Sequence, residues 1–122
     1  MKRCLIVDDS SVVRKVAKRI LSGPEMLVGE AADATEALAI CAAQMPDVII
    51  VDFALPDMDA IELIRHLATM SSLLKPQIVV CMIEFDVGAI MRSKRAGAAG
   101  YILKPFDRTQ LIESFRDMRL AA

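Results

Sequence analysis

Acidic side chains follow two apolar runs of the sequence, at the positions where buried strands would end. Asp8 and Asp9 come directly after the first run, and Asp52 comes directly after the second. Lys104 closes a third, shorter apolar stretch. In open α/β sheets, ligands bind beyond the carboxyl ends of the strands. If the three strands are parallel neighbours, three carboxylates and one ammonium group meet at the edge where chemistry is expected.

The electrostatics of such a cluster indicate a metal site. Two carboxylates about 4 Å apart repel each other by roughly 4 kcal/mol at an effective dielectric constant near 20, and one lysine does not offset three acids. A hard divalent cation does, and ligation by oxygen alone favours Mg²⁺, which keeps waters and phosphate oxygens as further ligands. The plainer alternative is that Asp8 and Asp9 cap a helix while Asp52 opens a turn. Capping explains one acid, but not acids and a lysine on separate strands.

Strand-like and helix-like segments alternate along the chain. Short apolar runs typical of buried strands lie at 4–7, 27–32, 48–52, 78–82 and 100–103. Apolar residues recur at helical spacing in 12–21, 34–44, 59–70, 87–96 and 107–118. A polar loop containing Ser71, Ser72 and Pro76 is expected before the fourth strand. Five strands, each followed by a helix, predict a doubly wound α/β fold with a five-stranded parallel sheet and helices on both faces.

Length and composition limit the function classes. A chain of 122 residues predicts one domain, 1–122, that buries around two-thirds of its surface. The net charge of −1 gives no indication of nucleic-acid binding through bulk charge. No apolar stretch reaches membrane-spanning length, and Met1-Lys2-Arg3 runs into a strand without the apolar region of a signal peptide. We therefore expect a cytoplasmic protein that binds neither nucleic acid nor membrane.

The cysteines and the single histidine have plain interpretations. Cys4, Cys41 and Cys81 lie inside apolar segments at wide, irregular spacing, which is typical of reduced core thiols and not of a zinc site. His66 lies beside Arg65 in a predicted helix. We expect it to be solvated and not to be a phosphohistidine.

Three motifs make the pattern specific. They are LIVDDS at 5–10, VDFALPDMD at 51–59 and GYILKPF at 100–106. In this order, and over nearly the whole chain, they resemble the receiver domain of two-component response regulators. The resemblance implies a flavodoxin-like sheet of strand order 2-1-3-4-5, with Asp52 as phosphoacceptor and Lys104 in contact with the phosphoryl oxygens. It also implies Mg²⁺ held by Asp9, Asp52 and the backbone carbonyl of Ala54, with Asp8 acting through water.

The sequence departs from this family at the conformational switch. Receivers normally carry Thr or Ser at the end of the fourth strand, where the hydroxyl bonds the phosphoryl group and couples it to an aromatic residue. Here that position falls on Met82, followed by Ile83, with Tyr101 at the aromatic position, and no Ser or Thr lies within nine residues on either side of Met82. A smaller departure is Ala60, where glycine is usual. A hydrogen bond to a charged group is worth roughly 1.5 to 3 kcal/mol, so its loss weakens the response about ten- to a hundred-fold.

The resemblance implies a signalling role and not an enzyme with a separate substrate. The chain would take a phosphoryl group from a histidine kinase or a phosphotransfer protein onto Asp52, catalyse only that transfer and its reversal by water, and signal by protein contact. The predicted contact surface surrounds Tyr101 and includes Arg92, Lys94, Arg95 and Phe106.

Met82 leaves a second interpretation open, a protein-binding module that works without phosphorylation. A third, an aspartate-nucleophile phosphatase, is disfavoured because Ala54 stands where a second acid would follow Asp52 by two residues. A DNA-binding regulator is not expected unless this chain is a fragment of a longer one, because 122 residues predict a single domain.

Overall fold

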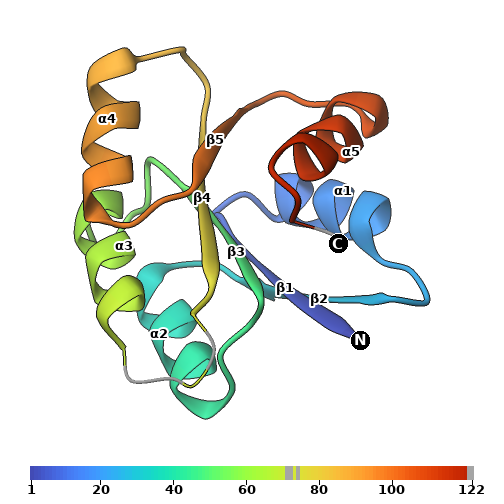
Figure 1. Ribbon diagram of the computed structural model, residues 1–122, viewed down its shortest axis with the longest axis horizontal. Coiled ribbons are helices and arrows are strands. Elements are labelled where there is room, and N and C mark those ends of the chain that lie inside the picture. Colours follow the sequence, from blue (N-terminus) through green and yellow to red (C-terminus); the bar gives the residue numbers. More distant parts are fainter. Residues whose placement is uncertain (71–72, 74, 121–122) are drawn as a thin grey trace.

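The computed structural model describes residues 1–70, 73 and 75–120, and within them five parallel strands alternate with five helices (Figure 1). The strands are β1 (Lys2–Val7), β2 (Met26–Ala31), β3 (Val48–Asp52), β4 (Gln77–Met82) and β5 (Gly100–Leu103). The helices are α1 (Ser11–Leu21), α2 (Ala34–Ala43), α3 (Ala60–Thr69), α4 (Val87–Ala96) and α5 (Arg108–Asp117). The predicted elements are confirmed, with ends that differ by one or two residues. Ser71 and Ser72 of the predicted loop lie outside the described residues.

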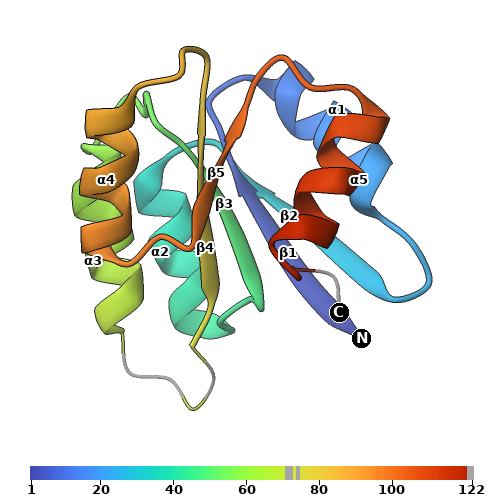
Figure 2. The same cartoon turned by 45° about the horizontal axis from the view of Figure 1, so that its top comes forward.

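The sheet has the order β2-β1-β3-β4-β5, as the resemblance implied. Figures 1 and 2 show α1 and α5 on one face and α2, α3 and α4 on the other. Each face packs its own apolar core against the helices that cover it. All five residues of the central strand β3 are buried, because helices cover it on both sides. This double coverage explains why the strand appears in the sequence as a continuous apolar run.

The strand register brings the functional residues to one edge. Val7 at the end of β1 pairs with Val51 in β3, so Asp8 and Asp52 come next on neighbouring strands. At the other side, Met82 of β4 pairs with Leu103 of β5, and Lys104 follows directly. Parallel strands end at the same side of the sheet. The fold therefore places the acids and the lysine together at the carboxyl edge.

The three cysteines are buried and free, as predicted for reduced core thiols. Burial raises the pKa of Cys4 and of Cys81 to about 12, and the pKa of Cys41 to about 11. These thiols therefore stay protonated at neutral pH and behave as small apolar side chains. None of the described helices is both long enough and apolar enough to cross a membrane.

Candidate functional site

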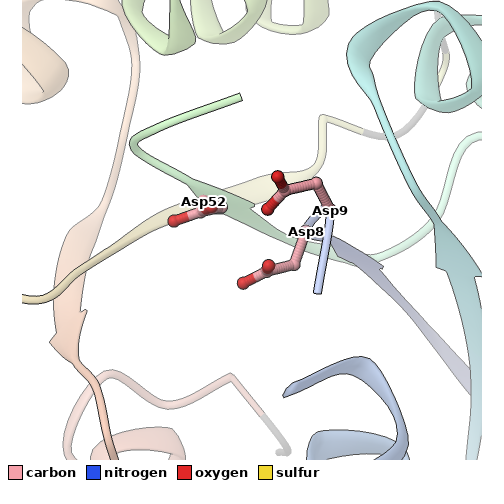
Figure 3. Close-up of side chains that lie close together, drawn as sticks. All are labelled: Asp8, Asp9 and Asp52. Atoms are coloured by element: carbon pink, nitrogen blue, oxygen red, sulfur yellow. The ribbon is translucent and has the colours of Figure 1, made fainter. Parts of the chain in front are cut away.

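Three carboxylates converge at the carboxyl edge of the sheet (Figure 3). Asp8, Asp9 and Asp52 each contribute an oxygen atom, and these oxygens all lie within 4.8 Å of one another. The side chains of Asp8 and Asp52 are buried, with 2% and 4% of each residue exposed, whereas Asp9 is exposed. The structure thus brings the three predicted acids together, with one of them open to solvent.

Lys104 provides the positive charge of the cluster. Its Nζ lies 2.8 Å from Asp8 Oδ2 and 2.9 Å from Asp52 Oδ1. Burial alone would lower the pKa of Lys104, but hydrogen bonds and charge attraction from the two aspartates outweigh it and raise the pKa. Three carboxylates and one ammonium leave a formal charge of −2, which one divalent ion neutralises. A donor set of hard carboxylate oxygens with this residual charge fits Mg²⁺.

The turn between β1 and α1 holds the first two acids. The N–H of Asp8 donates to Ala31 O at 3.1 Å, and the N–H of Ser10 donates to Asp8 Oδ1 at 2.9 Å. Ser10 is the N-cap of α1, and its Oγ accepts from the Val13 N–H at 3.3 Å. Helix capping therefore belongs to Ser10, and it does not account for the two acids that precede it.

Two of the three acids, Asp9 and Asp52, line a cavity of about 480 Å³ at the sheet edge. Its lining includes Asp9, Asp52, Phe53, Ala54, Met82, Ile83, Glu84, Asp86, Ala89 and Lys104. Ala54, whose carbonyl is predicted to bind the metal, is one of these lining residues. Sequence reasoning missed Glu84 and Asp86 as lining residues. The signal was present, because both acids closely follow the end of β4, which neighbours β3 in the sheet.

Met82 occupies the position predicted for the switch hydroxyl. Its side chain is buried, with 4% of the residue exposed, and it lines the cavity that contains Asp52. Cys81 instead packs into the core on the opposite face of the sheet, as the two-residue period of a strand requires. Ile83, the next residue, is 72% exposed at the rim of the cavity. No cysteine or hydroxyl side chain lines this cavity within the described part of the chain.

Tyr101 on β5 is half-buried and contacts an aromatic residue that was not predicted. Its ring packs edge-to-face against Phe85, with centroids 5.7 Å apart and planes at 60°. Phe85 lies in the loop after β4, two residues beyond Ile83. An edge-to-face pair is worth about 0.5 to 1.5 kcal/mol beyond its buried area. This contact joins the predicted switch tyrosine to the loop that borders the cavity.

The predicted partner surface is partly basic and partly apolar. Arg92, Lys94 and Arg95 are exposed on α4, as predicted, but Phe106 is half-buried against the core on the α1 and α5 face. Exposed apolar residues that were not predicted to belong to this surface adjoin α4 or lie on it: Ile83, Phe85, Val87 and Met91. His66 is exposed on α3, in agreement with its solvated interpretation.

Comparisons with known proteins identify the family. The family model for the response regulator receiver domain matches residues 4–116. Chemotaxis protein CheY of Thermotoga maritima is 31% identical over 115 residues, which are 93% of each chain. Sporulation initiation phosphotransferase F of Bacillus subtilis is 29% identical over 95% of this chain and 89% of its own length. The solved structure of the chemotaxis response regulator CheY4 of Vibrio cholerae superimposes with a TM-score of 0.89 at 30% identity, covering 97% of this chain and 98% of that one. The chain therefore belongs to the response regulator receiver family.

Proposed function

We propose that this receiver accepts a phosphoryl group on Asp52 from a histidine kinase or a phosphotransfer protein, and signals by protein contact. The observation that carries the proposal is the environment of Asp52, a buried carboxylate that Lys104 holds at 2.9 Å beside two further acids. In the transfer, a carboxylate oxygen of Asp52 bonds to phosphorus while the bond from phosphorus to the donor's histidine nitrogen breaks. Such a reaction depends on positioning and on charge neutralisation.

The chain's own groups divide this work. Asp9, Asp52 and the Ala54 carbonyl would hold Mg²⁺, with Asp8 acting through water, and the bound ion would neutralise charge on the phosphoryl oxygens. The contact of Lys104 with the Asp52 carboxylate at 2.9 Å supports a role for its ammonium in binding a phosphoryl oxygen carried by Asp52. Slow loss of the phosphoryl group to water at Asp52 belongs to the same proposal, as does a cytoplasmic setting where kinases supply the donor.

Phosphorylation by a small donor tests the proposal. Purified protein incubated with Mg²⁺ and acetyl phosphate is expected to gain one acid-labile phosphoryl group by mass spectrometry, and the Asp52→Ala variant to gain none. Asp117→Asn is the matched control, because Asp117 is an exposed acid on α5 and not part of the cluster. A native chain that gains no phosphoryl group and does not bind beryllofluoride would eliminate the phosphoacceptor function.

One observation favours a second candidate, a protein-binding module that works without phosphorylation. Met82, to which the family resemblance assigns the position of the switch hydroxyl, is buried and lines the cavity that contains Asp52. A thioether is a weak acceptor and cannot donate, so it does not reproduce the bond of a hydroxyl to the phosphoryl group. The two candidates differ in one measurable respect. In the second, the surface around Tyr101 binds its partner equally well before and after activation of Asp52.

A further inference from the structure

Arg14 connects the acidic turn to a neighbouring strand. On α1, its Nη1 donates to the backbone oxygen of Asp8 at 2.7 Å, and its Nε donates to Glu30 Oε1 at 3.0 Å. The side chains of Arg14 and Glu30 are each only 15% exposed. Glu30 lies on β2 and pairs in register with Ile6 of β1, two residues before Asp8. One guanidinium therefore ties together α1, β2 and the turn that carries the first two acids.

Asp9 depends on this turn for its position. Within the described residues, no hydrogen bond or ion pair holds the Asp9 carboxylate itself. The Asp8 oxygen that Arg14 binds belongs to the planar peptide group that leads into Asp9, so holding that oxygen restrains the backbone N and Cα of Asp9. On either side of this peptide group, the N–H of Asp8 donates to Ala31 O and the N–H of Ser10 donates to Asp8 Oδ1. The carbonyl bond from Arg14 completes the restraint of the turn.

We propose that Arg14, oriented by Glu30, is a positioning residue that places the Asp9 carboxylate for metal binding. The inference rests on the proposed function, because it concerns the ion that the phosphoacceptor site would hold. Arg14 suits this task better than lysine would. A planar guanidinium makes two bonds at fixed mutual angles, whereas an ammonium on a flexible stem does not.

Glu30 keeps the guanidinium in place by charge and by geometry. It also accepts from Lys15 Nζ at 2.9 and 3.2 Å, and Lys18 Nζ lies 3.8 Å away. The hydrogen bond from Lys15, with further support from Arg14 and Lys18, outweighs burial and keeps the pKa of Glu30 below its usual value. Glu30 is therefore ionised at neutral pH. Lys15 shares this carboxylate with Arg14, but among the described residues it donates no hydrogen bond to the turn.

An effect of Arg14 through its charge and an effect through positioning predict opposite changes in Mg²⁺ affinity when Arg14 is removed. A cation near the acids repels Mg²⁺, so if Arg14 acted by charge alone, its loss would strengthen metal binding. If Arg14 positions Asp9, its loss weakens metal binding. Outer-shell partners that orient ligands typically change metal affinity about 10- to 100-fold.

The experiment is an Mg²⁺ titration of the unphosphorylated protein, in which the NMR shifts of the Asp9 and Ser10 amides report metal binding. Arg14→Ala is expected to weaken Mg²⁺ binding about tenfold or more, and Glu30→Gln to weaken it less. Arg14→Lys, which keeps the charge, should fail to restore native affinity. Lys15→Ala is the matched control, because it removes one cation from the same carboxylate without touching the turn; it should bind Mg²⁺ as the native chain does, or slightly more tightly.

The inference is overturned if Arg14→Ala binds Mg²⁺ as tightly as Lys15→Ala does, or if Arg14→Lys restores native affinity. If Arg14→Ala does not fold, Glu30→Gln decides the matter in the same assay, and native affinity in that variant also overturns the inference. At saturating Mg²⁺, phosphorylation of Arg14→Ala by acetyl phosphate should approach the native rate, because the defect lies in metal affinity.

Failure of the proposed function is distinguishable from failure of this inference. A native chain that binds no Mg²⁺ contradicts the function. The metal-free amide spectra then test the restraint itself. Arg14→Ala should shift the Asp9 and Ser10 amides, whereas Lys15→Ala should not, and equal spectra for the two variants would overturn the proposed role of Arg14.

Discussion

Replacement of Asp9 by asparagine should stabilise the metal-free protein. Asp8 and Asp52 share the ammonium of Lys104, whereas no ion pair of the described residues includes Asp9. Asparagine has nearly the same shape as aspartate and removes one negative charge from the cluster. Because no described hydrogen bond reaches the Asp9 carboxylate, the substitution gives up no side-chain bond of the described structure.

The expected gain follows from the geometry of the cluster. At a separation of 4.8 Å, a pair of like charges costs about 0.9 kcal/mol in water and about 3.5 kcal/mol at a dielectric constant of 20. Asp9 faces two such carboxylates, and one ammonium at a comparable distance would offset about one of the two repulsions. Since Asp9 is exposed, the aqueous value is the better guide, so the net gain is about 1 kcal/mol. For a domain of this size, that raises the melting temperature by roughly 3 to 5 °C.

Thermal melts with and without Mg²⁺ measure the effect. In chelator, Asp9→Asn should melt above the native chain, and added salt should reduce the difference by screening. With Mg²⁺ in excess, the native chain should gain stability from binding while the variant gains little, so the difference narrows or reverses. Glu113→Gln, an exposed acid on α5, is the control and should leave the melting temperature nearly unchanged. A metal-free Asp9→Asn protein that melts at or below the native temperature would refute the crowding of charge at this site.

Two further predictions concern the loop after β3 and the switch. The carboxylate of Asp57 accepts hydrogen bonds from two backbone N–H groups at the start of α2, and these bonds lower the pKa of Asp57. The ionised carboxylate therefore stabilises the fold above its unfolded pKa of about 3.9. This stabilisation is lost as the pH falls through the lower pKa of the folded state. The stability deficit of Asp57→Asn in urea denaturation should therefore be full at pH 6 and shrink toward pH 3, and a deficit that does not change with pH would contradict the role of this carboxylate. Met82→Thr should increase the NMR shift changes at Tyr101 on beryllofluoride binding, because a restored bond of about 1.5 to 3 kcal/mol shifts the equilibrium about ten- to a hundred-fold. Met82→Ala opens the same space without adding a hydroxyl. Equal shift changes at Tyr101 in the two variants would show that the size of the Met82 side chain, and not the missing hydrogen bond, limits the response.

The acidic edge could be predicted because strands covered on both faces must be apolar throughout. An acid directly after such a run has to lie at the edge of the sheet, and the register then brings Asp8 beside Asp52. That the side chains of Met82 and Cys81 lie on opposite faces of the sheet was predictable for a similar reason, since successive residues of a strand point to opposite faces. These inferences need only the period of the strand and the parallel direction of its neighbours.

Contacts between side chains on different elements could not be predicted in this way. Arg14 and Glu30 are 16 residues apart in the sequence. In the sequence, each resembles an ordinary charged residue on a partly exposed element. Their bond depends on the crossing of α1 over β2, which periodicity does not specify. The pairing of Phe85 with Tyr101 depends in the same way on the path of a loop. Strand order also required the family resemblance, because five alternating units are compatible with more than one order.

The proposed chemistry and the conformational response depend on different strands. The acceptor, the acids and the lysine come from the ends of β1, β3 and β5, whereas the residue that would report phosphorylation comes from the end of β4. A substitution at Met82 can therefore alter the response while the groups of the transfer stay in place. Absence of phosphorylation at Asp52 would eliminate the first candidate, but its presence leaves both candidates open, because both allow it. The distinguishing observable is the environment of Tyr101, which packs against the loop that leaves β4 and so registers any movement of that strand end.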